Sequence, residues 1–276
     1  MVAVLRRGVW ILLLALMAAA PPATTAAAAA DRALILATTT SVYDSGLLDH
    51  LLPKFTALSG IEVRAVVRGS GAALRLGVSG DADVVLVHDR GAEDRFVAAG
   101  YGAFRRGVMS SRFLIVGPRG DPAGLARLRD AGAVLRRIAA TKSLFLSRGD
   151  DSGTHSAELR LWRAAGIDPR GGKGSWYRET GSGMGATLNI AAAMNAHTIT
   201  ESGSWVNFGN RGSLAVLYDR GLINPYGVIL VNPQRHPHIA ESHARGFIDW
   251  LTGPAAQKVI DNFTIDGEHP FRGAAN

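Results

Sequence analysis

From Arg32 onward, short apolar segments alternate with longer amphipathic ones. An apolar strand pattern covers Leu34–Ala37, a helical pattern covers residues 46–58, and a second strand pattern covers Glu62–Val67. The series continues with a helix near Ala72–Val78, a strand at Asp83–Val87, a helix at Ala92–Ala99 and a strand at Arg112–Val116. Short strands interleaved with helices predict an α/β fold built on a parallel sheet.

A second series follows a break marked by Pro118, Gly120 and Pro122. It comprises a helix at Ala131–Ala140, a strand at Leu144–Ser147, a helix opening near Thr154, a helix at Met184–Asn195, the segment His197–Thr200 and a strand at Leu222–Val231. Residues 239–263 carry a helical apolar stripe. The break predicts two lobes. Lobe I comprises residues 31–113 plus 225–276, and lobe II comprises residues 114–224.

The first thirty residues have the pattern of a secretory signal peptide. Arg6 and Arg7 precede an apolar run at Val9–Met17, and small residues lead to Ala26–Ala30. The apolar run is short for a membrane span, which favours cleavage over anchoring. The chain contains no cysteine, so it lacks a lipid-modified N-terminal cysteine, disulfides and thiolate chemistry. We therefore expect a periplasmic or otherwise extracytoplasmic protein after cleavage.

The net charge of the chain excludes few classes of binding partner. Without Arg6 and Arg7 the chain carries 28 basic and 23 acidic side chains, and it has no polybasic run. Nucleic-acid binding usually requires clustered positive charge, so we expect no nucleic-acid partner. A small basic surplus weakly favours an anionic ligand, and it fits a surface that only aids solubility equally well.

Hydroxyl residues follow two of the predicted strands of lobe I. Thr38-Thr39-Thr40-Ser41 comes after the first strand, and Arg68-Gly69-Ser70-Gly71 comes after the second. Helix N-termini present unpaired N–H groups to ligands beyond the carboxyl ends of the strands, and hydroxyls add uncharged donors. The alternatives are a helix cap for the first turn and an ordinary Gly-Ser-Gly turn for the second.

A third turn, Ser147–His155, is the most informative stretch of the chain. Arg148 can supply a charged fork, Ser152 and Thr154 can supply hydroxyls, and the amides of Gly153 and Thr154 open a helix. The pattern predicts an anion cradle. The alternative is a capped turn in which Arg148 pairs with Asp150 or Asp151.

The chemistry of the anion bears on the two carboxylates of this turn. A fully deprotonated dianion such as tungstate or molybdate offers acceptors only, whereas phosphate carries a proton that a carboxylate can accept. Asp150 and Asp151 could serve phosphate in that way, or they could hold Arg148 in place. The residues alone leave both possibilities open.

Two other functions fit the sequence less well. A serine hydrolase would use Ser152 as nucleophile and His155 as base. His155 follows Ser152 by only three residues at the start of the same helix, and this spacing does not direct the imidazole at the hydroxyl. The sequence also has no Gly-x-Ser-x-Gly elbow. His236, His238 and His243 lack a metal-ligand spacing. We therefore expect no catalytic residues, no cofactor and no protein-bound metal other than one within an oxyanion.

At these motifs the chain resembles the tungstate-binding proteins of ABC importers, a branch of the type II periplasmic binding proteins. The resemblance extends over nearly all of the mature chain. It rests on Thr38-Thr39-Thr40-Ser41, Asp44-Ser45-Gly46-Leu47-Leu48, Asp83-Val84-Val85-Leu86-Val87-His88-Asp89, Ser147–His155, Gly181-Ser182-Gly183-Met184-Gly185-Ala186-Thr187-Leu188-Asn189 and Asn224-Pro225-Tyr226-Gly227.

The resemblance implies two α/β lobes, each a mixed but mostly parallel sheet flanked by helices, joined by two crossing strands. It implies that the protein holds tungstate in the cleft and presents it to a membrane permease, and we expect a monomer. Molybdate or phosphate is the alternative ligand. The implied ligands are Thr40, Ser41 and Ser70 from one lobe and Arg148, Ser152, Gly153 and Thr154 from the other.

One segment departs from the family pattern. Where the family usually has a segment of the type Thr-x-Thr-Asp-Arg-Gly-Thr, this chain has Thr198-Ile199-Thr200-Glu201-Ser202-Gly203-Ser204. Ser202 replaces the usual arginine, so this loop brings no positive charge.

Overall fold

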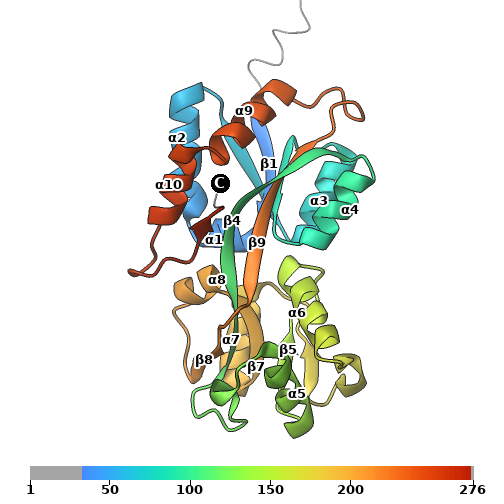
Figure 1. The fold of residues 1–276 in the computed structure, drawn as a ribbon, viewed down its shortest axis with the longest axis vertical. Coiled ribbons are helices and arrows are strands. Elements are labelled where there is room, and N and C mark those ends of the chain that lie inside the picture. The colour runs from blue at the N-terminus through green and yellow to red at the C-terminus, as the bar shows by residue number, and fades with distance from the viewer. Residues whose placement is uncertain (1–32, 275–276) are drawn as a thin grey trace, which may run out of the picture. The chain divides into compact units, whose positions relative to one another are not determined.

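The computed structural model describes residues 33–274, which form one compact unit. The predicted signal peptide lies outside the described residues. In the part that is described, no helix combines the length and apolar character needed to cross a membrane. Two groups of strands with their helices are joined by long strands, as Figure 1 shows.

The strands form a mixed sheet whose central members are long and antiparallel. The order is β2-β1-β3-β9-β4-β7-β5-β6, and β8 and β10 pair with β4. The strands are β1 (Leu34–Thr39), β2 (Val63–Arg68), β3 (Val84–Val87), β4 (Gly102–Pro118), β5 (Phe145–Ser147), β6 (Tyr177–Glu179), β7 (His197–Glu201), β8 (Leu214–Tyr218), β9 (Ile223–Val231) and β10 (Arg272–Gly273). Strands β1, β2 and β3 are mutually parallel, as are β5, β6 and β7.

The helices lie mostly where the apolar periodicity predicts them. They are α1 (Thr40–Asp44), α2 (Leu47–Ser59), α3 (Ser70–Ser79), α4 (Arg90–Ala98), α5 (Ala131–Thr141), α6 (Gly153–Ala164), α7 (Met184–Met194), α8 (Ser202–Asn207), α9 (Glu241–Leu251) and α10 (Pro254–Asn262). Short 3₁₀ turns occur at Leu125–Arg127 and Pro169–Gly172. The predicted helical stretch 239–263 consists of two helices. Gly253 lies between them, and Pro254 begins the second, because proline is tolerated in the first turn of a helix but not in its interior.

Two strands connect the two groups. Strand β4 pairs with β9 from Gly102 to Arg112, and from Phe113 onward it pairs with β7. Figure 1 shows β4 and β9 side by side through the middle of the folded molecule. Their pairing is continuous from one group to the other, and the predicted lobe boundaries at 113 and 225 fall within these strands.

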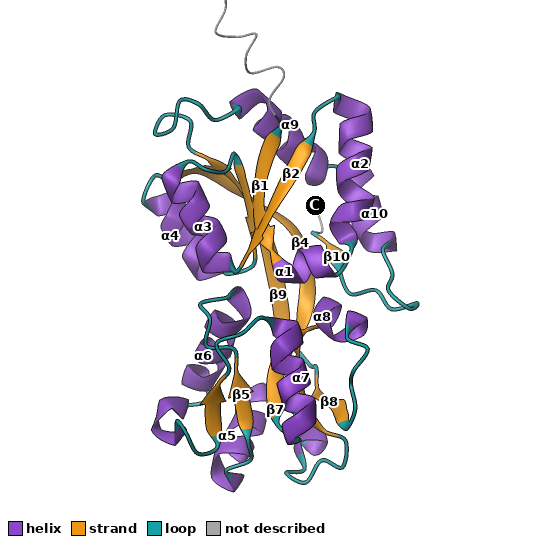
Figure 2. Cartoon of the chain, turned by 180° about the vertical axis from the view of Figure 1, so that it is seen from behind, coloured by secondary structure: helices purple, strands orange, loops and turns teal. Residues whose placement is uncertain are grey.

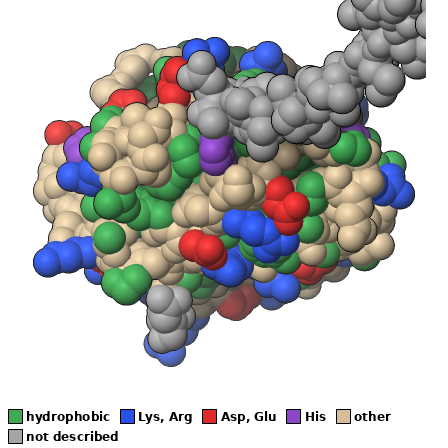
Figure 3. Space-filling view, turned by 90° about the horizontal axis from the view of Figure 1, so that it is seen from above, with side chains coloured by type: hydrophobic (Ala, Val, Ile, Leu, Met, Phe, Trp, Pro, Cys, Tyr) green, Lys and Arg blue, Asp and Glu red, His purple; other side chains and the backbone are tan. Residues whose placement is uncertain are grey.

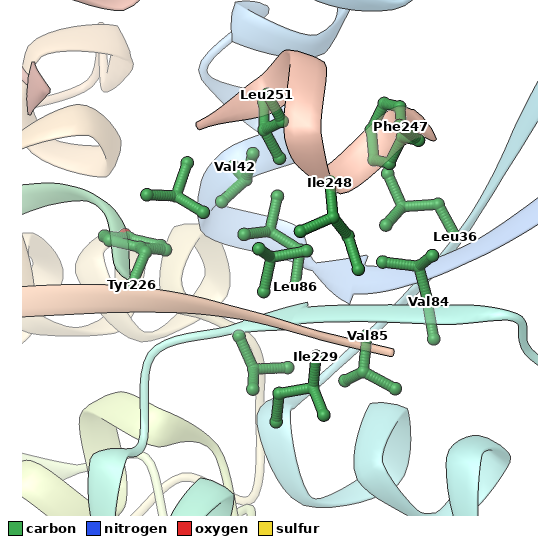
Figure 4. Packing of buried hydrophobic residues seen from close by; sticks show 14 of the residues in the cluster. Leu36, Val42, Val84, Val85, Leu86, Tyr226, Ile229, Phe247, Ile248 and Leu251 are labelled. Atoms are coloured by element: carbon green, nitrogen blue, oxygen red, sulfur yellow. The ribbon is translucent and has the colours of Figure 1, made fainter. Parts of the chain in front are cut away.

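The hydrophobic core is divided in the same region. One cluster contains buried residues from Leu34 to Met109 and from Tyr226 to Phe271, and we call this part lobe I. Leu36, Val84 and Leu86 face α9, whereas Val85 and Ile229 point to the opposite face of the sheet (Figure 4). This alternation follows from the two-residue period of a strand, and it lets helices cover both faces.

Lobe II is the part between Phe113 and Leu222, and it has an apolar cluster on each face of its sheet. Ile115 and Phe145 belong to the cluster that packs with α5 and α6, whereas Leu114 and Leu146 belong to the one that packs with α7. Neighbouring residues of one strand thus serve opposite faces. Figure 2 shows α7 in front of this sheet, with α5 and α6 behind and beside it.

The surface carries charges of both signs. On the face seen in Figure 3, lysine and arginine side chains are interspersed with acidic ones and do not form a large patch of one sign.

Candidate functional site

The parallel strands of both lobes end at the same place. In lobe I, β1 runs into Thr40 and Ser41, β2 leads to Ser70, and β3 leads to His88. In lobe II, β5 leads to Arg148 and β7 ends at Glu201. Ligands in α/β proteins lie beyond the carboxyl ends of such strands, so this is the candidate binding site.

The two lobes touch at the N-terminus of α6. A Cβ atom placed on Gly153 would lie 2.7 Å from Ser70 Oγ and 2.8 Å from His88 Cε1. These distances are shorter than normal van der Waals contacts, so only glycine allows lobe I to approach the first turn of α6 this closely. The amides of that turn have no acceptor within the helix.

The hydroxyl of Ser70 is buried without a hydrogen-bond partner among the described residues. Its residue is 1% exposed and begins α3. Because a buried polar atom without a partner costs about 1–3 kcal/mol, most buried polar atoms in folded proteins are hydrogen-bonded. The hydroxyl therefore provides a donor close to the α6 N-terminus.

Arg148 is buried and bound to Asp150. Its side chain is 5% exposed, and its Nη2 and Nε atoms lie 2.6 and 3.2 Å from Asp150 Oδ2. Asp150 Oδ1 also accepts from the amide of Ser152 at 3.2 Å. Of the two carboxylates left open by the sequence, Asp150 holds Arg148, and Asp151 is exposed in the left-handed region with φ 55°. The Arg148–Asp150 pair is compatible both with a capped turn and with an anion cradle, so it does not distinguish between them.

The hydroxyl side chains of lobe II have internal partners. Ser152 caps α6, because its Oγ accepts from the amide of His155 at 3.2 Å, and its own proton is free to point elsewhere. Thr154 donates its hydroxyl proton to Glu201 Oε1, and Ser204 donates to Glu201 Oε2 at 2.9 Å. Thr154 can thus reach a ligand directly only through its amide, while its hydroxyl holds Glu201.

The lobe I hydroxyls are arranged differently. Ser41 is buried, and its Oγ lies 3.1 Å from Thr39 Oγ1, 3.3 Å from His88 Nε2 and 3.4 Å from Tyr226 Oη. Thr40 is half-buried, and its side chain makes no hydrogen bond to another described residue. The structure therefore brings Ser41, Ser70, Arg148, Ser152, Gly153 and Thr154 into one region, and it gives Thr40 no contact that identifies a role.

Burial governs the ionisable groups here. Burial lowers the pKa of His88 below its ordinary value, and the Glu201 carboxylate acts in the opposite direction. Burial and the nearby Glu201 raise the pKa of Tyr226, so both side chains are neutral near pH 7.

Sequence reasoning assigned no role to His88, Glu201, Asn224 or Tyr226, although all four are buried at or behind the site. His88 follows β3 as the hydroxyl turns follow β1 and β2, and that position is the signal that could have identified it. Asn224 and Tyr226 belong to the antiparallel strand β9, which no rule about parallel strand ends would select.

Two side chains also bridge the lobes at the rim. Arg160 on α6 donates to Asp89 Oδ1 at 3.1 Å, and Asn207 on α8 donates to the carbonyl of Asp44 at 2.6 Å. Asp89 additionally caps α4 by accepting from the amide of Ala92. The strand ends therefore lie within a region where the lobes contact each other on more than one side.

Comparison with known proteins gives consistent matches. Residues 22–255 match the family model described as the PBP superfamily domain. The tungstate-binding protein TupA of Peptoclostridium acidaminophilum is 44% identical over 231 residues, which cover 82% of this chain and 80% of that protein.

Two solved structures are similar as well. That of a tungstate ABC transporter protein from Geobacter sulfurreducens shares 45% sequence identity with a TM-score of 0.78, covering 84% of this chain and 99% of the other. The tungstate-binding protein TupA from Desulfovibrio alaskensis G20 shares 40% identity with a TM-score of 0.76, covering 88% and 99%.

Proposed function

Because the chain belongs to the PBP superfamily, we propose that it is an extracytoplasmic solute-binding protein that captures tungstate between its lobes and delivers it to an ABC importer. The names of the relatives support tungstate over the molybdate and phosphate alternatives. The fold supports the mode of capture, since both lobes direct parallel strand ends and helix N-termini at one region.

The unpartnered hydroxyl of Ser70 is the observation that carries this proposal. It lies against the first turn of α6, and buried Arg148 precedes that turn. A neutral donor, a set of helix amides and a guanidinium match an anion in a site from which water is largely excluded. We take Ser41, Ser70, Arg148, Ser152, Gly153 and Thr154 as the ligand-binding residues, and we keep Thr40 as a predicted one.

The carboxylates of the site favour a fully deprotonated anion. Asp150 accepts from Arg148 and from the Ser152 amide, and Glu201 accepts from Thr154 and Ser204. Both carboxylates therefore already have protein donors and do not need a proton from the ligand. A phosphate monoanion or hydrogen phosphate would gain little here, whereas tungstate requires only donors.

We also infer that the protein is not an enzyme. His155 Nδ1 accepts from the amide of Asp151 at 3.3 Å, and Ser152 Oγ accepts from the amide of His155. Nδ1 of the imidazole thus already accepts a backbone hydrogen bond, so it is not paired with the hydroxyl that a hydrolase would activate. Purified protein is expected to release no product from acyl or phosphate esters, and burst hydrolysis that Ser152→Ala abolishes would contradict this inference.

Calorimetric competition among tungstate, molybdate, sulfate and phosphate is the decisive experiment. We expect tungstate to bind tightest and to raise the melting temperature, with a stabilisation of about 2.7 kcal/mol at a hundredfold excess over the dissociation constant. A preference for phosphate would reject the tungstate assignment while leaving the fold unaffected.

The partner and location follow from the same proposal. A Sec signal peptide at residues 1–30 would direct the chain out of the cytoplasm, and N-terminal sequencing of the exported protein would locate the cleavage site. We propose a monomer in solution, which light scattering can check, and a membrane permease as its protein partner. We propose that this activity requires no cofactor.

A further inference from the structure

His88 is held on both ring nitrogens directly behind the site. Its Nε2 lies 3.3 Å from Ser41 Oγ, and its Nδ1 lies 3.1 Å from Asn224 Oδ1. The ring also packs on Tyr226, with centroids 4.8 Å apart. The residue is 3% exposed, so water contributes little to its hydrogen bonding. The orientation of the imidazole is therefore fixed, and only the positions of its protons can vary.

The protons of this network can be assigned from Asn224. Its Nδ2 donates to Ser111 Oγ at 2.9 Å and to Tyr226 Oη at 3.2 Å, so its Oδ1 faces His88 and accepts from Nδ1–H. A neutral imidazole has one N–H group, so Nε2 is then an acceptor. In that state the hydroxyl of Ser41 donates its single proton to Nε2.

A bound dianion changes this arrangement. Tungstate offers acceptors only, so Ser41 must turn its proton toward the ligand in order to bind it. Nε2 would then face a lone pair of Ser41 without a proton between them, in a buried position where an unpaired polar atom is costly. A proton on Nε2 resolves the conflict, because Nε2–H donates to Ser41 Oγ and Ser41 donates to the anion.

We propose that His88 is the positioning residue for Ser41, and that it takes up a proton when the anion binds, so that Nε2–H turns the Ser41 hydroxyl toward the ligand. This inference rests on the proposed function, since it takes Ser41 as a ligand of the anion. It adds a coupled proton to that function, and it gives the site a positive charge from lobe I that exists only in the bound state.

The surrounding charges are compatible with such a change. Without a ligand, burial keeps the pKa of His88 low, and Arg148 lowers it further, while Glu201 and Asp89 raise it. Tyr226 stays neutral because burial raises its pKa. A dianion beside Ser41 adds two negative charges to those of Glu201 and Asp89, and opposite charge within a few ångströms favours the imidazolium.

Calorimetry in buffers of different ionisation enthalpy measures the proton directly. At about pH 7.5, above the ordinary pKa of histidine, we expect the wild type to take up close to one proton per tungstate. At pH values between the pKa of His88 in the free protein and its pKa in the complex, the affinity for tungstate should fall by about tenfold for each unit of increase in pH. In His88→Gln the side-chain amide can donate N–H to Ser41 without titrating, so tungstate should bind with no proton uptake and a flat pH profile.

The ¹⁵N spectrum of histidine-labelled protein identifies the group. We expect the Nε2 resonance of His88 to move to the position of a protonated nitrogen when tungstate is added, and His50→Gln, which removes an exposed histidine, should leave this shift and the proton uptake unchanged. Tungstate binding with no change at Nε2 would overturn the inference, whether or not His88→Gln folds. Absence of tungstate binding by the wild type would instead reject the proposed function.

Discussion

The two sides of the candidate site differ in kind. Lobe I contributes Ser41, Ser70 and a neutral His88, none of which carries a full charge. Lobe II contributes the Arg148–Asp150 pair, Glu201 and the N-terminus of α6. Charge-assisted bonds are the strong ones, whereas neutral donors add less energy and more geometric selection. We infer that lobe II provides most of the attraction and that lobe I selects by closing over the ligand.

Removal of Arg148 tests the charged side and should have the largest effect. Arg148→Ala is expected to weaken tungstate binding by about 3 kcal/mol or more, over a hundredfold, because a buried charge-assisted contact is lost. Isothermal titration measures the change. Arg170→Ala is the matched control, since Arg170 pairs with Asp168 two residues away but is exposed, and it should bind as the wild type does. Equal affinities in all three proteins would exclude Arg148 from the site.

A second test concerns Glu158, a buried carboxylate of lobe II. Burial raises the pKa of Glu158 on α6 to about 7 from 4.5, although Tyr177 and Trp162 donate to it at 2.8 and 3.1 Å. Because the folded state holds this proton more tightly than the unfolded chain, the free energy of unfolding should fall as pH rises from 4.5 to about 7.

Glu158→Gln should remove this contribution. Relative to the wild type, the variant should gain stability as pH rises, by about 3 kcal/mol in total. Urea unfolding at several pH values measures the difference, and Glu241→Gln, which changes a partly exposed carboxylate, is the control. Parallel pH profiles for Glu158→Gln and the wild type would show that the carboxyl of Glu158 keeps an ordinary pKa.

Substitution of Gly153 tests how closely the two sides approach. In Gly153→Ala the new methyl group would lie within 3 Å of Ser70 and His88, so the lobes must separate slightly. We expect affinity to fall by about tenfold to a hundredfold, or about 1.4–2.7 kcal/mol, measured by titration calorimetry. Gly183→Ala is the control, because Gly183 lies at the N-terminus of α7, as Gly153 lies at that of α6, and has open space at its Cβ position. If the two variants bind alike, the contact at Gly153 has no role in binding.

The smallest expected effect tests a single neutral donor. Ser70→Ala should lose about 0.5–1.5 kcal/mol of binding free energy, roughly twofold to tenfold in affinity, since one uncharged hydrogen bond is removed. Protein stability should not decrease, because the hydroxyl has no hydrogen-bond partner among residues 33–274. Ser79→Ala, at the exposed end of the same helix, provides the comparison in both measurements. A loss as large as that of Arg148→Ala would contradict the division between the two sides.

Much of the fold could be predicted because its elements have strong local patterns. The strand pattern at Leu34–Ala37 and the helical pattern at Ala131–Ala140 correspond to β1 and α5 within a few residues. Strand β4 was predicted only from Arg112, although it begins at Gly102. Its first half contains Gly102, Gly107 and two arginines, and it is a strand because it pairs with distant β9, which no local pattern reveals.

The site could be predicted as far as the motifs lie at strand ends. Ser70 and Gly153 meet because sheet topology brings those ends together. The hydrogen-bond partner of Thr154 could not be predicted, since it depends on Glu201 reaching across from β7. The role of His88 depends on Asn224, 136 positions away, and such pairings are determined by tertiary packing rather than by spacing.

The position of β9 has a consequence for the order of folding. This strand lies between β3 and β4 in the sheet, yet it follows all of lobe II in the chain. During synthesis or refolding, one edge of β3 therefore stays unpaired until residues 223–231 pair with it. Such long-range pairing is slow. The strands of lobe II, in contrast, come from the contiguous segment 113–222. Lobe II can thus fold first, and a nascent chain that stalls before β9 would present an aggregation-prone sheet edge to chaperones.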